Sequence, residues 1–267
     1  MRVIISISSD IGTALARNWV SSGHEVWGTY RRWSENCDLL ETIGVKLEYC
    51  DLGSVTSITK ALESFPTGSD WSCAVLASGN LEPIGLFHEI DFAEWSNSVQ
   101  VNFVGQLQFL HGLMQINKEL KKRRNVILFA GGATNSATER YSAYTVSKIA
   151  SIKLCELLDF EYDEYIFTCI GPGWVESKIH DATLKAGTKA GNNFEKTLKL
   201  RKEKLMNPVE NVIEFCNWII SKDKDVVGGR NFSVVHDAWR KGNIERELRN
   251  DENIFKLRRY GNDLKLD

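Results

Sequence analysis

A tyrosine and a lysine near the middle of the chain have the spacing of an acid–base pair. Tyr144 and Lys148 stand four residues apart at the start of a helical pattern, so both side chains lie on one face of the helix. A nearby ammonium stabilises a phenolate, and a tyrosine tuned in this way exchanges a proton with a carbonyl or alcohol oxygen near neutral pH. The same spacing also fits an ordinary half-buried aromatic residue and a solvated lysine, so the rest of the chain must decide.

Length and composition are those of a globular protein without an obvious macromolecular partner. The 267 residues suffice for one α/β domain, and 43% of them are hydrophobic and 25% charged. The formal net charge of −2 gives no sign of a nucleic-acid or anionic-membrane partner. No apolar run approaches the ~20 residues of a membrane span, and the first residues do not form a secretory signal. We expect a cytoplasmic protein.

Cysteine and histidine spacing gives no sign of a metal site. The six cysteines include no Cys-x-x-Cys pair, and the five histidines lack the spacing of metal ligands. We therefore expect reduced thiols in the core and no bound metal.

Apolar, β-branched runs alternate with helical patterns along the chain. Strands are expected at Val3–Ile7, Gly23–Tyr30, Val45–Cys50, Trp71–Ala77, Asn125–Ala130, Tyr165–Ile170 and Val226–Val235. Helices are expected at Thr13–Ser22, Cys37–Ile43, Val55–Ser64, Phe92–Met114, Tyr144 to about Phe160, and Pro208–Ile220. This alternation predicts an α/β fold with a doubly wound, mostly parallel seven-stranded sheet between two layers of helices, the Rossmann arrangement.

The turn between the first strand and the first helix is a candidate phosphate site, because backbone N–H groups converge at a helix N-terminus. A Gly-x-x-x-Gly-x-Gly dinucleotide loop needs glycine at three positions that are here Ser6, Asp10 and Gly12. Asp10 suits a helix N-cap, but its carboxylate repels a pyrophosphate. By itself this motif is weak.

Two further positions bear on the adenosine end of a dinucleotide. Tyr30 and Arg31 follow the second strand, where a carboxylate suits a ribose hydroxyl and an arginine suits a 2′-phosphate. Arg31 therefore favours NADP over NAD, although Arg31 and Arg32 also fit a plain basic turn. Asp51 can accept from an adenine amino group or cap the helix that follows it.

Asn102 lies inside a long helical pattern and has to find hydrogen-bond partners, either as a bend stabiliser or in a water relay. Residues 178–206 are polar and show no clear strand, which is typical of a lid or binding loop.

In this order, the features resemble the short-chain dehydrogenase/reductase (SDR) family over nearly the whole chain. The matching motifs are the Ser8-Ser-Asp-Ile-Gly12 turn, Asp51, Ala77-Ser-Gly79 in place of Asn-Ala-Gly, Asn102, Tyr144-x-x-x-Lys148 and Pro172-Gly-Trp-Val-Glu-Ser177. The resemblance implies one Rossmann-type NAD(P)-binding domain over residues 1–267. It also implies a substrate-loop insertion at about 178–206 and a charged C-terminal tail from about 240.

The resemblance also implies roles for individual residues. The family's tyrosine is the general acid/base, its lysine binds the nicotinamide ribose and lowers the tyrosine pKa, and its asparagine helps to hold a relay water; Tyr144, Lys148 and Asn102 match them. Ser177 matches the hydroxyl that contacts the nicotinamide carboxamide. The implied cofactor-binding set is Ser6, Ser8, Ser9, Asp10, Ile11, Gly12, Arg31, Asp51, Leu52, Ser78, Gly79, Tyr144, Lys148, Pro172, Gly173, Val175 and Ser177.

One catalytic position departs from the family pattern. Gly131 stands where the family has a substrate-orienting serine, and Thr134 or Ser136 can replace that hydroxyl only if their loop folds back. Loss of one oxyanion donor typically costs roughly 2.7–4 kcal/mol.

The leading hypothesis is an NADP-dependent oxidoreductase, with NAD as the alternative cofactor and a small carbonyl or alcohol compound as substrate. The stretch Asn231–Trp239 resembles relatives in bacterial surface-sugar biosynthesis, which adds sugar derivatives to the candidates. The alternative is a catalytically weak or inactive cofactor-binding sensor or scaffold, favoured by Ser6, Asp10 and Gly131. Relatives commonly pair through helices equivalent to Phe92–Met114 and Tyr144–Phe160, so the resemblance implies a homodimer or homotetramer.

Overall fold

A single parallel sheet organises the chain in the computed structural model, which describes residues 1–66, 68–116, 123–132 and 136–260. The strand order is β3-β2-β1-β4-β5-β6-β7, and every neighbouring pair is parallel. The strands are β1 (Arg2–Ile5), β2 (Val26–Tyr30), β3 (Lys46–Tyr49), β4 (Cys73–Leu76), β5 (Arg124–Phe129), β6 (Tyr165–Gly171) and β7 (Asn231–Ser233). The predicted doubly wound fold is confirmed.

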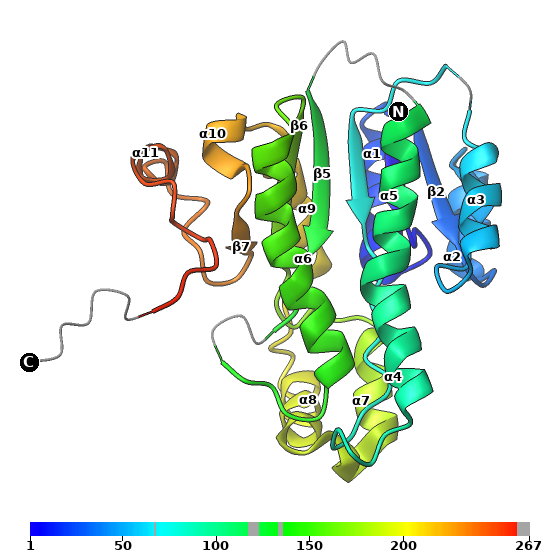
Figure 1. Cartoon of the computed structure of the whole chain (residues 1–267), viewed down its shortest axis with the longest axis vertical. Helices are drawn as coiled ribbons and strands as arrows, with labels where there is room; N and C mark the ends of the chain where they lie inside the picture. The colour runs from blue at the N-terminus through cyan, green and yellow to red at the C-terminus, as the bar shows by residue number, and fades with distance from the viewer. Residues whose placement is uncertain (67, 117–122, 133–135, 261–267) are drawn as a thin grey trace, which may run out of the picture.

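Helices cover both faces of the sheet (Figure 1). Their bounds are α1 (Asp10–Ser21), α2 (Glu35–Thr42), α3 (Val55–Glu63), α4 (Phe92–Val99), η1 (Gln100–Val104), α5 (Gly105–Ile116), α6 (Ser142–Glu161), α7 (Ile179–Ala186), η2 (Gly187–Ala190), α8 (Asn192–Lys202), α9 (Val209–Ile220), α10 (Lys224–Val227) and α11 (Ile244–Asn250). Helices α1 and α9 contribute to one core cluster, and α3, α5 and α6 to the other.

The central strands are buried on both faces because their side chains alternate between these two clusters. In β1, Ile4 packs into the α1/α9 cluster, whereas Val3 and Ile5 pack into the α3/α5/α6 cluster. All three side chains are at most 1% exposed. This arrangement explains why the strand reads as a continuous apolar run.

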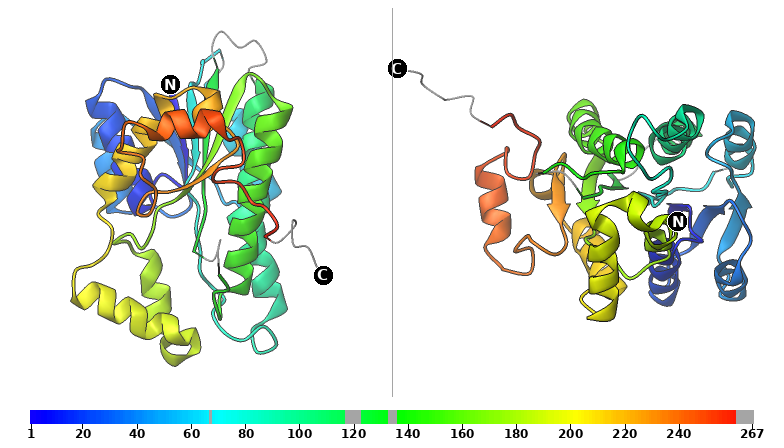
Figure 2. Two further views of the ribbon diagram at one scale, coloured as in Figure 1. Left: turned by 90° about the vertical axis from the view of Figure 1, so that its left-hand side faces the viewer. Right: turned by 90° about the horizontal axis from the view of Figure 1, so that it is seen from below.

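Two predicted elements differ from the observed ones. The expected strand Val226–Val235 begins instead with the helical turn α10, and Gly229, at φ +67°, reverses the chain into the short β7. The expected loop at 178–206 contains α7, η2 and α8. These helices project beyond the carboxyl ends of the strands (Figures 1 and 2), and their sparse apolar residues explain why the pattern was missed.

The long predicted helix Phe92–Met114 is interrupted at its middle. A π-helical segment, η1, joins α4 to α5, and Asn102 within it is fully buried. Such segments often mark functional sites because they redirect side chains out of the α-helical register.

The chain after β7 covers the edge of the sheet. Asn231 N donates to Phe255 O over 2.8 Å, and the Phe255 ring packs on Phe232 with centroids 5.2 Å apart. The buried guanidinium of Arg230 donates to the carbonyl oxygens of Leu248, Asp251 and Ile254. The predicted charged tail is therefore partly ordered, and it covers part of the outer edge of β7.

All six cysteines are buried and free. None of the helices within the described parts of the chain is long and apolar enough to cross a membrane.

Candidate active site

Tyr144 and Lys148 lie on one face of α6, at the end of the helix that faces the carboxyl edge of the sheet. The Lys148 side chain is 3% exposed, and its Nζ lies 5.6 Å from the centroid of the Tyr144 ring. The amine donates a hydrogen bond of 2.9 Å to Ser78 O, in the turn after β4. The predicted pair is therefore brought together, with Lys148 held by the backbone of a neighbouring strand end.

Burial shifts both pKa values in the direction that opposes the expected phenolate. Desolvation raises the pKa of Tyr144 to about 12 and lowers the pKa of Lys148 to about 8. The expectation that the ammonium lowers the tyrosine pKa is wrong for this arrangement, because both groups lose water and the amine is directed at Ser78 O. At neutral pH Tyr144 keeps its proton, as a proton donor requires.

Asn102 connects the π-helical segment to the same turn. Its Oδ1 accepts from Asn80 N and its Nδ2 donates to Asn80 O, both over 2.8 Å, and Nδ2 also donates to Ser98 Oγ. The carbonyl oxygen and the amino group of the buried side-chain amide thus both have hydrogen-bond partners. Asn102 therefore ties η1 to the turn after β4, and its part in a water relay stays a prediction.

Gln106 completes this network and was missed by the sequence reasoning. Its Oε1 accepts from Ser78 N over 3.3 Å, while its Nε2 donates to Asn102 O. Ser78 therefore has its N–H held by Gln106 and its carbonyl held by Lys148. The available signal was a second buried polar residue one turn after Asn102, which also needs partners. A water-sized cavity of about 10 Å³ lies beside Gln106, Lys148 and Ser151.

Gly131 lies directly against the tyrosine. A Cβ atom at Gly131 would stand 2.7 Å from Tyr144 Cε1 and 3.1 Å from its hydroxyl oxygen, so the phenol ring occupies the space of a side chain there. Gly131 does not have a positive φ, so backbone strain does not require the glycine. Of the proposed substitute hydroxyls, Ser136 is exposed and Thr134 lies outside the described residues.

The turn between β1 and α1 has the close approach expected of a phosphate cradle. A Cβ at Gly12 would stand 2.8 Å from both Ser6 O and Ile7 O, so only glycine lets α1 pack this closely. Ser6 adopts φ 62°, a conformation that favours glycine. The N-cap is Ser9, whose Oγ accepts from Gly12 N over 3.1 Å, and this corrects the N-cap assignment of Asp10. Ser8 and Ile11 are partly exposed in the same turn.

Asp10 instead links the first helix to the segment after β6. It is the first residue of α1, and its Oδ2 accepts from Lys178 N over 2.7 Å. The N-terminus of a helix stabilises a carboxylate, so the charge of Asp10 is favourable there without a bound ligand. The same charge stands at the end of the helix where an anionic pyrophosphate has to approach.

The candidate adenosine contacts lie around the ends of β2 and β3. Arg31 is exposed and makes no hydrogen bond or ion pair with the residues that the structure describes. Asp51 Oδ1 accepts from Gly53 N over 2.9 Å, whereas Ser54 caps α3, so the helix-cap alternative for Asp51 is wrong. Leu52 is buried, and its carbonyl oxygen lies where a Cβ of Gly105 would be, which fixes this turn against α5.

The predicted contacts after β6 lie at the same edge of the sheet. Pro172 O accepts from Asn207 Nδ2 over 2.7 Å, Gly173 has φ +77°, and Val175 is 3% exposed. Ser177 O accepts from His180 N at the start of α7. Ile179 Cδ1 lies 3.2 Å from a Cβ placed on Gly79, so the start of α7 lies close to the turn after β4.

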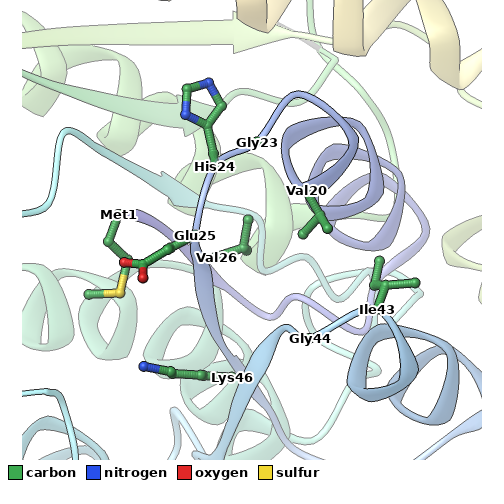
Figure 3. A pocket seen from close by; sticks show the side chains of 9 residues that line it. All are labelled: Met1, Val20, Gly23, His24, Glu25, Val26, Ile43, Gly44 and Lys46. Atoms are coloured by element: carbon green, nitrogen blue, oxygen red, sulfur yellow. The ribbon is translucent and has the colours of Figure 1, made fainter.

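A larger hollow lies at the opposite edge of the sheet and is not part of this site. Figure 3 shows its lining near the amino ends of β2 and β3. Its volume is about 230 Å³, and it is lined by Met1, Val20, Gly23, His24, Glu25, Val26, Ile43, Gly44 and Lys46. Ligands of open parallel sheets bind at the carboxyl edge instead, where Tyr144 lies.

Comparison with known proteins agrees with this fold. A family model described as short chain dehydrogenase matches residues 2–186. No curated protein matches the chain in sequence. A short-chain dehydrogenase/reductase of Saccharomyces cerevisiae superposes with a TM-score of 0.76 at 19% identity, covering 89% of this chain and 97% of that one.

Two other solved structures share the fold, with similar TM-scores and sequence identities. A variant of actinorhodin polyketide ketoreductase with NADPH has a TM-score of 0.73 at 17% identity, covering 87% of this chain and 94% of its own. The ligand-free aldohexose dehydrogenase of Thermoplasma acidophilum has a TM-score of 0.73 at 16% identity, covering 87% and 91%. The matched family model spans well over half of the sequence, and this chain therefore belongs to the short-chain dehydrogenase family of oxidoreductases.

Proposed function

We propose that this chain is an NADP-dependent reductase of a small carbonyl compound, with Tyr144 as the proton donor. The observation that carries the proposal is the position of Tyr144 and Lys148 at the carboxyl edge of the sheet, with Lys148 Nζ 2.9 Å from Ser78 O. A protonated tyrosine with a buried amine beside it suits the reduction of a carbonyl better than the oxidation of an alcohol. The reverse reaction uses the same groups at higher pH.

The residues present fit a nicotinamide dinucleotide, with one exception. The close packing at Gly12 brings the N-terminus of α1 against the end of β1, and a helix N-terminus suits a pyrophosphate, with Ser8, Ser9 and Ile11 in the same turn. The N–H of Gly12 itself is bound to Ser9 Oγ. Ser78, Gly79, Pro172, Gly173, Val175 and Ser177 are the proposed nicotinamide contacts. Arg31, Asp51 and Leu52 are the proposed adenosine contacts, and the NADPH of the similar ketoreductase supports NADP over NAD. The exception is the carboxylate of Asp10.

The proposed chemistry divides between the cofactor and the chain. When bound, the nicotinamide supplies a hydride to the carbonyl carbon. The Tyr144 hydroxyl gives its proton to the carbonyl oxygen as negative charge develops there. Lys148, whose pKa burial lowers to about 8, is then a suitable donor to return a proton to the phenolate, and it regains one from solvent. Asn102 and Gln106 hold the turn that positions the lysine.

We further propose that residues 1–267 act as one cofactor-binding domain that works as a homodimer or homotetramer in the cytoplasm. Figure 1 shows α5 and α6 side by side on one face of the sheet. This face exposes apolar side chains: Phe160 is 91% exposed, Phe92 65%, and Val146 and Leu157 each 47%. A second copy of the same helices is suited to cover them.

A sensor or scaffold without turnover is the second candidate. It is favoured by the Asp10 carboxylate at the pyrophosphate position and by the absence of a hydroxyl at Gly131. Fluorescence titration with NADPH and NADH, followed by a carbonyl panel with the native protein and Tyr144→Phe, separates the two. Turnover that Tyr144→Phe abolishes while NADPH still binds supports the reductase. NADPH binding without turnover of any carbonyl compound supports the sensor.

A further inference from the structure

The side chains around Tyr144 form a small apolar core of their own. Leu81, Tyr141 and Ala190 are at most 9% exposed and form its centre. The partly buried hydrophobic residues packed against them are Ile84, Tyr144, Ile179, Ala182, Ala186 and Phe194. We call this set the Tyr144 cluster. It is separate from the two clusters that flank the sheet.

The Tyr144 cluster is built largely from the segment that follows β6. Ile179, Ala182 and Ala186 come from α7, Ala190 from η2 and Phe194 from α8. The remaining members come from the turn after β4 and from the start of α6. The side chains of this segment therefore pack around Tyr144, the residue at which the proposed carbonyl substrate has to bind.

Two buried hydroxyl groups in this region, those of Tyr141 and Thr183, are paired with each other. Tyr141 OH and Thr183 Oγ1 lie 2.8 Å apart, and the two residues are 5% and 1% exposed. Each hydroxyl therefore has a partner within the chain, and both are turned toward each other in a buried position.

Charged side chains also contact the segment. Glu139 Oε1 accepts from Asn192 N over 2.7 Å at an exposed position, and Arg201 pairs with Asp181 on the surface. Asp10 holds Lys178 N at the other end. The contacts of Glu139 and Asp10 fasten the segment to the rest of the chain, whereas the Arg201–Asp181 pair joins α8 to α7 within it.

From these observations we infer that the carbonyl substrate carries apolar substituents, which bind against the Tyr144 cluster beneath α7 and α8. This inference rests on the proposed reductase function. A sugar would place several hydroxyl groups against these side chains, and a buried hydroxyl without a partner is strongly disfavoured. The stretch Asn231–Trp239, whose sequence adds sugars to the candidates, contributes no member to the cluster.

The test compares two classes of carbonyl compound with the full-length native protein and NADPH. For straight-chain methyl ketones from butanone upward, kcat/KM should rise about fourfold per added methylene until the cluster is filled. Aldohexoses and aldopentoses should be turned over at least about 100-fold more slowly than the best ketone. Equal or faster turnover of the aldoses, or no dependence on chain length, overturns the inference while leaving the reductase function intact.

Three variants on α8 test whether the effect of chain length comes from the Tyr144 cluster. Phe194→Ala should reduce the gain per methylene, and Phe194→Leu should keep most of it. Leu198→Ala, at a 42% exposed position on the same helix, should leave the chain-length series unchanged. An unchanged series in folded Phe194→Ala contradicts the role of the cluster, and the native series stands as the test if that variant does not fold.

Failure of the proposed function is recognised separately by a binding measurement. If no carbonyl compound is reduced, secondary alcohols of increasing chain length and sorbitol are titrated against the protein with NADP⁺, with tryptophan fluorescence as the readout. Affinity that rises about fourfold per methylene, without binding of sorbitol, supports the apolar site although the reductase is refuted. Preference for sorbitol, or no binding by either class, overturns the inference as well.

Discussion

The ring of Tyr144 fills the space beside Gly131 that a side chain would need, with its Cε1 atom 2.7 Å from the position of a Cβ. The glycine in place of the family's serine and the position of the Tyr144 ring therefore depend on each other. A hydroxyl cannot be added at Gly131 without moving the proposed proton donor.

This contact predicts a graded effect of two substitutions at Gly131. Gly131→Ala should lower kcat for a simple ketone about tenfold, because its methyl group displaces the Tyr144 hydroxyl. Gly131→Ser carries the same Cβ and adds a donor, so its kcat should exceed that of Gly131→Ala by an order of magnitude or more. The ratio of the two kcat values from steady-state kinetics gives the contribution of the serine hydroxyl. Equal kcat values in the two variants would show that this position does not orient the carbonyl.

Lys148 is expected to reduce the stability of the folded chain at neutral pH. Burial lowers its pKa to about 8 from the ordinary value of 10.5, so the folded state binds fewer protons than the unfolded state between these values. The resulting loss in the free energy of unfolding has its full size below pH 8 and disappears as the pH approaches 10.5. Allowing for the lost bond to Ser78 O, Lys148→Met should stabilise the protein by about 1–3 kcal/mol at neutral pH.

Urea unfolding of the Lys148→Met variant near pH 7 and near pH 10 measures this effect, and the gain should shrink at the higher pH. Lys153→Met on the same helix is the control, because its side chain is 50% exposed and should change stability little at either pH. A gain of equal size at both pH values would refute the titration of Lys148 as its cause.

Arg31 should select the cofactor. If its exposed guanidinium pairs with a 2′-phosphate, NADPH should bind about tenfold more tightly than NADH, since a charge-assisted hydrogen bond contributes about 1.5–3 kcal/mol. Arg31→Ala should remove most of this difference, and Arg32→Ala much less of it. Dissociation constants from fluorescence titration decide the matter. Equal affinities of the native protein for the two cofactors would refute the assignment to NADP.

Asp10 should weaken cofactor binding through its charge. Asp10→Asn keeps an oxygen acceptor for Lys178 N and removes the repulsion of a pyrophosphate, so NADPH affinity should rise about tenfold at low salt. The gain should shrink at high salt, because ions screen near-surface charges. Glu35→Gln, at the first residue of α2, provides the control of an acid at another helix N-terminus. Weaker binding by Asp10→Asn would mean that the Lys178 contact itself supports the cofactor.

The apolar face of α6 should mediate assembly. Phe160→Asp and Leu157→Asp should lower the mass seen by light scattering at micromolar concentration to that of a monomer, because each places a charge in a buried interface. Val55→Asp, at a 60% exposed apolar position on α3, should leave the oligomer intact. A monomeric mass for the native protein would contradict the proposal directly.

Much of the fold could be predicted from local patterns. The continuous apolar run in β1 indicates a strand buried on both faces, and the spacing of Tyr144 and Lys148 indicates one face of a helix, because both patterns are periodicities of nearby residues. The helices in residues 178–206 were missed for the same physical reason, since their few apolar residues pack on Tyr144 and Leu81 instead of forming a long amphipathic stripe.

The amino-acid sequence by itself determined the alternation of strands and helices, the doubly wound sheet and the order of the family motifs. Only the tertiary structure decided that Gly131 contacts Tyr144, that Gln106 and Lys148 bind the backbone N–H and C=O of Ser78, and that Asp10 accepts from Lys178 N. These contacts join residues that are far apart along the chain, and no local periodicity records the distance between such segments. The pKa values follow the same rule, because the desolvation that raises the pKa of Tyr144 comes from side chains that folding alone brings around it.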